Sequence, residues 1–305
     1  MKLVDTRCPI CDSTENYTVL YKNNFSELDF NANTFSARRI PDCIHYQMVR
    51  CNNDNLVRAN PVLEQVDLDI LYRNSKLTYE EGINNLTISY LDSLKDILRI
   101  LPENAKILEI GCGNGFMLKA LFDLGYKEVF GIEPSIDAIQ KADKDIIKNI
   151  TADVLRPGIF KQNEFYFIFF FQAFDHIRDP IFFLSICYDF LIPGGFILAF
   201  THDVESLSAK FLKDKSPIID IEHPYLYSKE TIRKIFKKSK FIPLKIYSPK
   251  NLVSLKHLIR LIPLSKSIKI SLLNSGNGLL NLLLNIRLKV RLGNICIIAK
   301  KQSLN

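Results

Sequence analysis

The amino-acid sequence predicts an α/β protein built around a mainly parallel sheet. Strand-like and helix-like stretches alternate between residues 105 and 201 with short connections, as in sheets whose strands are joined by covering helices. Residues 165–171 read Phe-Tyr-Phe-Ile-Phe-Phe-Phe, and an apolar run of that length indicates a strand buried on both faces. A turn with three glycines, at residues 111–115, follows the first strand of this region.

The remaining elements follow from hydrophobic spacing and from stop signals. Residues 62–101 carry apolar side chains at helical spacing, and Pro102 stops that helical stretch. Residues 248–292 are rich in Leu and basic residues, and we interpret them as a helical insertion before the last strand. We expect strands at 105–110, 127–132, 146–151, 165–171, 195–201, 241–247 and 293–299, and helices at 115–124, 135–143, 179–191 and 228–238.

Composition and cysteine content favour a cytoplasmic globular protein. The 305 residues are 47% hydrophobic and 24% charged, which is ample material for a core. The sequence starts without an apolar signal segment, and no apolar run approaches the roughly 20 residues of a membrane span. Seven cysteines are an odd number without the spacing of a disulfide framework, so we expect a reducing compartment.

The net charge of +7 is divided unevenly along the chain. No Asp or Glu follows Glu230, whereas Lys and Arg continue to the C-terminal end. Such asymmetry predicts an anionic partner for the last quarter of the chain: phosphate groups, a membrane surface or nucleic acid. One expectation is peripheral contact with the inner membrane surface through residues 248–292; the alternative is that this insertion closes over a pocket as a lid.

The glycine turn gives the first indication of function. Its sequence is Glu109-Ile-Gly-Cys-Gly-Asn-Gly115, and glycines suit a turn whose backbone must approach a ligand closely. The third glycine of the dinucleotide fingerprint G-x-G-x-x-G would stand at position 116, where the chain has Phe116. The turn resembles motif I of the class I S-adenosylmethionine-dependent methyltransferases. This resemblance implies a Rossmann-like seven-stranded sheet whose last strand is antiparallel.

Acidic and amide residues after successive strands predict the cofactor site. An acid about 20 residues after the glycines can accept hydrogen bonds from both ribose hydroxyls, an acid after the third strand can bind the adenine amine, and the residue after the fourth strand can line the methionine end. Each such residue alone is more often a solvated side chain, but their order and spacing together favour S-adenosylmethionine binding. The predicted cofactor-binding residues are Glu109, Gly111, Cys112, Gly113, Glu133, Asp153 and Gln172.

Methylation of a hydroxyl or an acidic C–H requires a base, because the sulfonium already activates the methyl group. Candidates follow strands four and five: Asp175, His176, His202 and Asp203. A later segment, Glu222-His-Pro-Tyr225, adds His223 and Tyr225. We favour His176, His223 and Tyr225 as catalytic residues. His176 has a structural alternative, packing against the cofactor, and Tyr225 has another, anchoring its own loop.

The N-terminal region predicts a small metal-binding module over residues 1–61. Cys8-Pro-Ile-Cys11 has the spacing of a zinc knuckle, and Cys51-Asn-Asn-Asp54 matches a second knuckle with Asp54 in place of a cysteine. The pattern resembles the zinc ribbon of sugar and polysaccharide methyltransferases, except that Asn55 replaces a glycine. We expect a structural zinc on Cys8, Cys11, Cys51 and Asp54. Cys43 or His45 is an alternative fourth ligand, and loss of the metal is a further alternative.

The resulting hypothesis has three parts: a zinc-ribbon-like module (1–61), a helical linker (62–104) and a methyltransferase domain (105–305). By resemblance, the acceptor is a small molecule or a lipid-linked sugar of surface polysaccharide or secondary metabolism, methylated on oxygen or carbon. One alternative is an RNA methyltransferase, but the basic residues alternate with Leu and Ile rather than with the aromatic residues that stack on bases. The other is a non-catalytic zinc-ribbon scaffold that docks on membranes.

Overall fold

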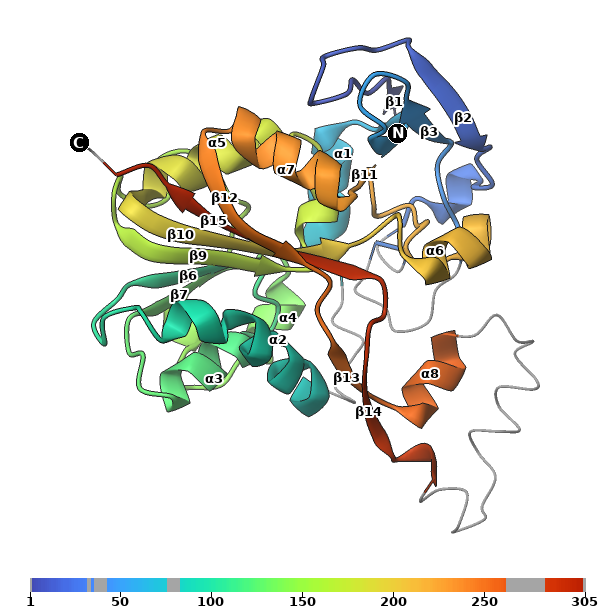
Figure 1. Ribbon diagram of the computed structural model, residues 1–305. Coiled ribbons are helices and arrows are strands. Elements are labelled where there is room, and N and C mark those ends of the chain that lie inside the picture. Colours follow the sequence, from blue (N-terminus) through green and yellow to red (C-terminus); the bar gives the residue numbers. More distant parts are fainter. Residues whose placement is uncertain (1, 32–33, 36–42, 76–82, 262–282, 304–305) are drawn as a thin grey trace.

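A central sheet with helices on both faces makes up most of the molecule (Figure 1). The computed structural model describes residues 2–31, 34–35, 43–75, 83–261 and 283–303. The helices are Gln65–Arg73 (α1), Ile83–Leu98 (α2), Phe116–Asp123 (α3), Ile136–Gln140 (α4), Pro180–Phe190 (α5), Leu207–Leu212 (α6), Lys229–Lys238 (α7) and Leu255–Leu261 (α8). Helices α2 and α3 cover one face of the sheet, and α5 and α7 cover the other.

The central sheet has seven strands in the order β12-β15-β10-β9-β6-β7-β8. Their bounds are Ile107–Ile110 (β6), Val129–Ile132 (β7), Ile150–Thr151 (β8), Phe165–Phe171 (β9), Leu191–His202 (β10), Phe241–Tyr247 (β12) and Asn294–Lys301 (β15). Strand β15 runs antiparallel to both of its neighbours, whereas β8, β7, β6, β9 and β10 are parallel to one another. The structure therefore confirms the Rossmann-like seven-stranded sheet with an antiparallel last strand.

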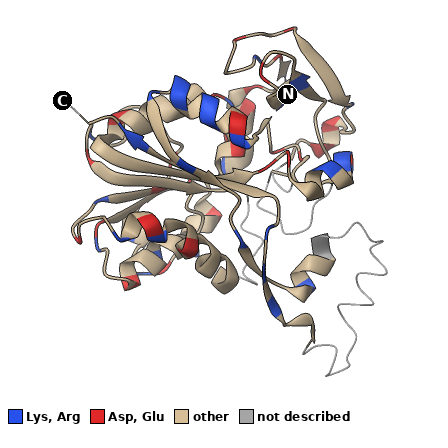
Figure 2. Ribbon diagram, in the orientation of Figure 1, with Lys and Arg blue, Asp and Glu red and all other residues tan. Residues whose placement is uncertain are grey.

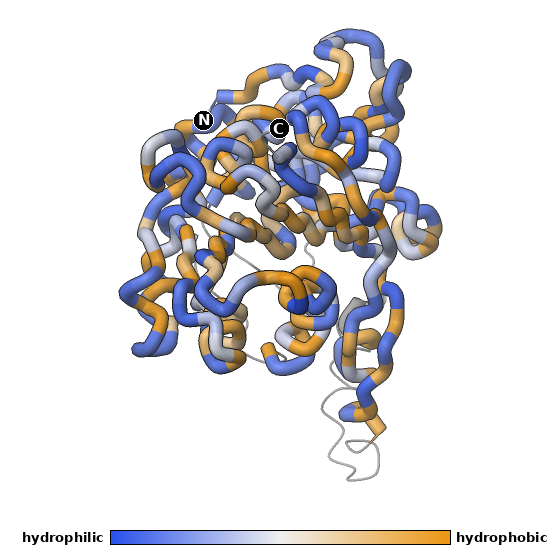
Figure 3. Tube along the Cα trace, turned by 60° about the vertical axis from the view of Figure 1, so that its left-hand side comes forward, coloured by the Kyte–Doolittle hydropathy of each residue, from blue (hydrophilic) through white to orange (hydrophobic). Residues whose placement is uncertain are grey.

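Strand β9 contributes to the hydrophobic core on both faces of the sheet. Figure 3 shows that apolar residues gather in the interior of the molecule. Phe167 and Phe169 pack on the side of the sheet covered by α2 and α3, and Phe165 and Phe170 pack on the opposite side. All four side chains are fully buried. This packing fixes the carboxyl end of β9, and with it the residues that follow at the edge of the sheet.

The N-terminal module contains short strands and shares one sheet with a later segment. Its strands are Leu3–Val4 (β1), Tyr17–Tyr21 (β2), Met48–Cys51 (β3), Val57–Ala59 (β4) and Val62–Leu63 (β5). Strand β1 pairs with β5, and a four-stranded sheet has the order β11-β4-β3-β2. Strand β11 (Tyr225–Leu226) comes after β10 in the chain, so the module's sheet is completed by a segment of the predicted methyltransferase domain.

The predicted helical insertion, 248–292, is helical only in part. Helix α8 confirms the expectation, and residues 262–282 lie outside the described residues. The ends of the insertion, however, form an antiparallel ribbon of strands Asn251–Ser254 (β13) and Arg287–Val290 (β14). Contacts with the rest of the fold decide this conformation: Ser89 Oγ on α2 accepts the Leu252 N–H at 2.8 Å, and Asn251 donates to Asn294 Oδ1 at 2.7 Å.

The predicted helical stretch 62–101 corresponds to two helices, α1 and α2, with residues 76–82 between them outside the described part. Helix α2 buries Tyr90, Leu94 and Ile97 against the sheet. Among the described residues, no helix is both long and apolar enough to cross a membrane.

Candidate functional site

A cavity of about 750 Å³ lies at the carboxyl ends of β6, β7, β9 and β10. Ligands bind at this edge in open parallel sheets, because the connections diverge there. The structure brings all seven predicted cofactor-binding residues to the wall of this cavity: Glu109, Gly111, Cys112, Gly113, Glu133, Asp153 and Gln172.

The glycine turn presents its backbone to the cavity. Gly113 has a φ of +56°, and no atom lies within 4 Å of the position that a Cβ would occupy, so open space faces the turn. Gly115 has a φ of +68°, and there a Cβ would lie 2.6 Å from Ile146 Cδ1. The Cys112 sulfur packs inward against Gly131, so this buried residue offers its backbone to a ligand.

Glu133 holds the glycine turn in place from the end of β7. Its Oε2 accepts the Gly113 N–H at 2.8 Å, and its Oε1 accepts the Ser135 N–H at 2.8 Å. Burial raises the pKa of Glu133, although these two N–H groups act in the opposite direction. The Glu133 carboxylate therefore connects the glycine turn after β6 with the turn at Ser135 after β7. A nucleoside would lie between these two turns.

Two buried polar atoms in the cavity wall lack hydrogen-bond partners within the described residues: Glu109 Oε2 and Gln172 Oε1. The Glu109 side chain is almost fully buried, and burial followed by the charge of Glu133 raises its pKa well above the ordinary value. Buried polar atoms are normally paired, so unpaired acceptors beside an open cavity indicate a ligand with donors or positive charge. S-adenosylmethionine has both, in its ammonium and sulfonium groups, and these residues fit it.

Asp153 lies at the cavity wall after β8, but it already has partners. Its Oδ2 accepts from Arg156 Nε at 2.9 Å, and Arg73 lies 3.7 Å from its Oδ1. Burial alone raises the pKa of Asp153, but the hydrogen bond from Arg156 and other contacts outweigh burial and lower it. Contact with adenine, as predicted, would have to share the carboxylate with these arginines.

Three histidines surround Asp175 at one end of the cavity. Asp175 and His176 lie in a 3-10 turn, Phe174–His176, directly after β9, and His202 ends β10. Asp175 is fully buried, its Oδ2 accepts from His202 Nδ1, and its Oδ1 lies 4.0 Å from His176 Nε2. The ring of His223 lies 4.8 Å from the rings of His176 and His202. Burial raises the pKa of Asp175, but the charges of His202 and His223 and the hydrogen bond outweigh it and hold the pKa far below its usual range.

Hydrogen bonds fix the orientation of the imidazole rings. His223 Nδ1 lies 2.9 Å from the Ile218 carbonyl oxygen, so this nitrogen donates and carries the proton. His176 Nδ1 lies 3.2 Å from the Tyr72 hydroxyl. These contacts through Nδ1 set how the rings of His176 and His223 are turned relative to Asp175.

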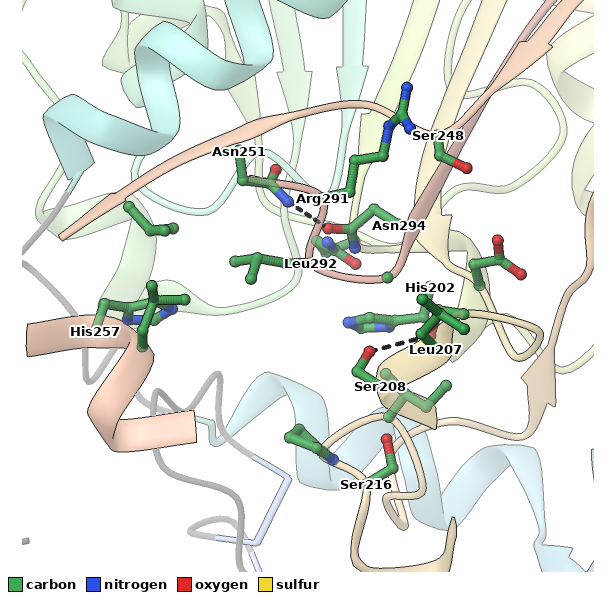
Figure 4. Close-up of a pocket in the computed structure, with 18 of the residues that line it drawn as sticks. His202, Leu207, Ser208, Ser216, Ser248, Asn251, His257, Arg291, Leu292 and Asn294 are labelled. Carbon is green, nitrogen blue, oxygen red and sulfur yellow. Dashed lines mark hydrogen bonds between the residues drawn. The ribbon is translucent and has the colours of Figure 1, made fainter. Parts of the chain in front are cut away.

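A second cavity, of about 990 Å³, adjoins the first. It is bordered by α6, β13, α8 and residues 291–294, and the His202 ring projects into it (Figure 4). Gln172, His202 and Tyr90 line both cavities, so the two spaces meet beside the histidines. The sequence named His202 among the candidate bases but gave no reason to favour it over His176 and His223, because its pairing with Asp175 depends on the adjacency of β9 and β10.

Tyr225, the third predicted catalytic residue, lies elsewhere. It is in β11, almost fully buried against the N-terminal module, and its hydroxyl donates to the Arg7 carbonyl oxygen at 3.2 Å. Tyr225 lines neither of the two cavities. Burial raises its pKa to about 12. The structure therefore gives Tyr225 the anchoring position that was the alternative to catalysis.

The structure brings Cys8, Cys11, Cys51 and Asp54 together, with potential ligand atoms within 4.8 Å of one another. Both halves of the group have the same turn: the N–H of Asp12 donates to Cys8 O, and the N–H of Asn55 donates to Cys51 O. Asp12 and Asn55 both have a φ of 61°, a conformation that glycine, Asn and Asp adopt most readily. Asn55 thus fits the position that the resemblance assigns to glycine. The group contains neither Cys43 nor His45, whose Nδ1 lies 2.8 Å from Tyr46 O.

Comparison with known proteins agrees with this geometry. Residues 85–244 match a family model described as a methyltransferase domain. Ubiquinone biosynthesis O-methyltransferases of Cereibacter sphaeroides are 28% identical over 116 residues, which is 35% of this chain and 45% of theirs. The chain thus spans less than half the length of these curated relatives.

Solved methyltransferase structures resemble the chain over most of its length. A putative methyltransferase from Bacillus halodurans has a TM-score of 0.49 and 17% identity, covering 70% of this chain and 100% of that one. An S-adenosylmethionine-dependent methyltransferase from Archaeoglobus fulgidus has a TM-score of 0.49 and 19% identity, covering 73% and 97%.

The family match covers more than half of the chain and includes the glycine turn, Glu133 and the strands that carry the histidines. The central sheet has the seven strands and the antiparallel last strand that the resemblance to motif I implied. The chain belongs to the methyltransferase-domain family, and its central sheet has the fold of the class I S-adenosylmethionine-dependent methyltransferases.

Proposed function

We propose that the chain is an S-adenosylmethionine-dependent methyltransferase and that it methylates a small-molecule acceptor, a sugar of surface polysaccharide or secondary metabolism, on a hydroxyl or an acidic C–H. The observation that carries this proposal is the group of histidines around Asp175, where the two cavities meet. A donor in the first cavity and an acceptor in the second would meet at these side chains. The sugar class rests on the paired cysteine turns, which match the module of sugar methyltransferases.

His202, held by Asp175, is the proposed base. S-adenosylmethionine, when bound, supplies an electrophilic methyl group on a sulfonium. The hydrogen bond from His202 Nδ1 to Asp175 leaves Nε2 facing the acceptor cavity (Figure 4). As the acceptor oxygen bonds to the methyl carbon and the S–C bond breaks, the hydroxyl proton moves to His202 Nε2. The buried Asp175 carboxylate orients the ring and stabilises its positive charge, as an acid behind a histidine does in other enzymes.

The predicted cofactor contacts support the placement of the donor. We propose that Glu133 binds the ribose, that Glu109 and the backbone of Gly111 to Gly113 bind the methionine part, and that Gln172 lies beside the reacting centre. Asp153 would bind adenine. His176 and His223 would contact the acceptor rather than take its proton.

The second cavity supports an acceptor larger than a free monosaccharide. Its walls are largely apolar, and Leu207 and Phe211 on α6 are almost fully exposed at this cavity. We propose that a lipid carrier of the acceptor sugar lies there, and that the basic end of the chain approaches an anionic membrane surface. Strand β13 borders the cavity, and its partner strand β14 carries the basic residues Arg287 and Lys289 (Figure 2).

We propose that Cys8, Cys11, Cys51 and Asp54 bind a structural zinc. Three sulfur ligands and one carboxylate are a donor set that zinc accepts, and the four positions leave none open for catalysis. Asp54 lies 3.5 Å from Lys234 on α7, so the group also connects the module to the methyltransferase sheet.

The proposal is tested with the full chain, methyl-labelled S-adenosylmethionine and a panel of free, nucleotide-linked and lipid-linked sugars, with products identified by mass spectrometry. Labelled lipid-linked sugar is the expected result. His202→Asn should lower kcat by about 10²- to 10⁴-fold, the usual contribution of a positioned base, with affinity for S-adenosylhomocysteine nearly unchanged. Cofactor binding without methylation of any sugar would reject the acceptor class. Absence of cofactor binding would reject the assigned cavity.

A further inference from the structure

We propose that Asp175, His176 and His223 form a second metal site, for one divalent transition-metal cation, separate from the cysteine group. One carboxylate oxygen and two imidazole nitrogens lie within 4.8 Å of one another. Two histidines and one carboxylate on one side of a cation are a recurrent ligand set for such metals, with the remaining positions open. The three residues come from the turn after β9 and from the segment before β11, two elements that the fold brings together.

Asp175 provides the strongest reason for a cation. Its side chain is fully buried, and its two oxygens differ: Oδ2 accepts from His202, but Oδ1 has no hydrogen-bond partner among the residues described. A buried carboxylate oxygen without a partner is costly unless positive charge compensates it. A cation bound to Oδ1 would provide that charge at the atom that lacks a partner.

Hydrogen bonds at Nδ1 orient the imidazole rings of His176 and His223, as is usual for histidines that bind a metal. A ligating histidine generally has its second ring nitrogen hydrogen-bonded to a carbonyl, a carboxylate or water, which fixes the tautomer and the ring orientation. His223 Nδ1 donates to the Ile218 carbonyl at 2.9 Å, and His176 Nδ1 lies 3.2 Å from the Tyr72 hydroxyl. The hydrogen bond between His202 and Asp175 restrains the carboxylate in the same way.

The position of the site suggests what the cation would do. His176 and His223 line the first cavity, whereas Asp175 lies behind them, so the open coordination positions face the place where the cavities meet. An acceptor oxygen bound there would be oriented, and its proton would be easier to remove. This role rests on the proposed function, but binding of the cation does not.

The donor atoms distinguish the two sites. The cysteine group offers three thiolates, which select zinc and other soft cations, whereas a site of nitrogen and oxygen donors also accepts Mn²⁺. The experiment therefore uses the full chain with one equivalent of zinc, which the thiolates bind first, and then titrates it with Mn²⁺. Calorimetry gives the stoichiometry, and electron paramagnetic resonance follows the loss of the free Mn²⁺ signal.

One Mn²⁺ per chain that holds one zinc is expected. Loss of an outer hydrogen-bond partner alone costs a metal site about 10- to 100-fold in affinity, so loss of a ligand in Asp175→Asn, His176→Ala or His223→Ala should cost at least as much. His257→Ala is the matched control, because His257 lines both cavities but is not in the group. Cys11→Ser should also leave Mn²⁺ binding unchanged.

Affinity for S-adenosylhomocysteine identifies the variants that remain folded. If Asp175→Asn fails this criterion, the part-exposed His176 provides the test, because its replacement disturbs the core least. Failure of the wild type to bind Mn²⁺ would overturn the inference, as would equal affinity in wild type and folded ligand variants. Neither result bears on methyl transfer, and failure of methyl transfer would leave the Mn²⁺ measurement unaffected.

Discussion

At Glu109 a carboxyl group is buried beside the cofactor cavity, with a pKa raised by burial and by the charge of Glu133. The ammonium and sulfonium groups of S-adenosylmethionine favour the ionised carboxylate and would lower this pKa on binding. The bound state then holds fewer protons than the free state. Affinity for S-adenosylmethionine should therefore rise with pH between the pKa of the bound enzyme and the higher pKa of the free enzyme.

Calorimetry in two buffers of different ionisation enthalpy measures the released proton directly. Glu109→Gln, which cannot ionise, should bind S-adenosylmethionine without the buffer dependence. If the wild type and this variant release equal numbers of protons, Glu109 is not the group that responds to the cofactor.

Glu133 accepts two backbone N–H bonds and, in the proposed site, the ribose hydroxyls. Hydrogen bonds to charged groups contribute about 1.5–3 kcal/mol. Glu133→Ala should thus weaken S-adenosylhomocysteine binding about 10- to 100-fold, as measured by calorimetry. Glu128→Ala, at an exposed position just before β7, is the matched control and should bind like the wild type. Wild-type affinity in Glu133→Ala would remove this residue from the site.

At the scale of single elements, the paired cysteine turns lead to a prediction about the affinity for zinc. Asp54 occupies the position of a fourth cysteine in a turn whose backbone matches that of Cys8–Cys11. Asp54→Cys should therefore tighten zinc binding, measured by competition with a chelator, and should raise the melting temperature. Glu15→Cys, at an exposed position of the same module and outside the ligand group, is the control. No change in zinc affinity for Asp54→Cys would show that Asp54 does not contact the metal.

Sequence predicted some elements closely and others only in part, for identifiable reasons. Strand β9 matches its predicted bounds because an apolar run bounded by polar residues allows one assignment. The ends of the insertion form strands β13 and β14 rather than helices, because the Ser89 hydroxyl, far away in sequence, accepts the Leu252 N–H. Tyr225 was expected at the active site, but it pairs with β4 through backbone contacts that no local pattern reveals. The Asp175–His202 pair likewise depends on strand adjacency.

For the whole molecule, the uneven charge distribution predicts electrostatic association with anionic membranes. Full-length protein should float with vesicles of anionic lipid at low salt and should be released at high salt, because exposed charges are screened over about 8 Å at physiological ionic strength. Charge reversal at Arg287→Glu on β14, combined with Arg291→Glu just after this strand, should weaken flotation. Lys127→Glu, in the exposed turn before β7, is the control. Equal flotation with neutral vesicles would contradict an electrostatic origin.

The pairing of β11 with β4 also has a consequence during synthesis on the ribosome. Arg58 leaves the exit tunnel long before Tyr225, its partner in the sheet, has been translated. Until then, β4 is an edge strand without its partner β11, while most of the methyltransferase sheet is still being synthesised. Early binding of metal by Cys8, Cys11 and Cys51 would order the N-terminal module during this time. Strand β11, which completes the sheet of the module, would be synthesised together with His223.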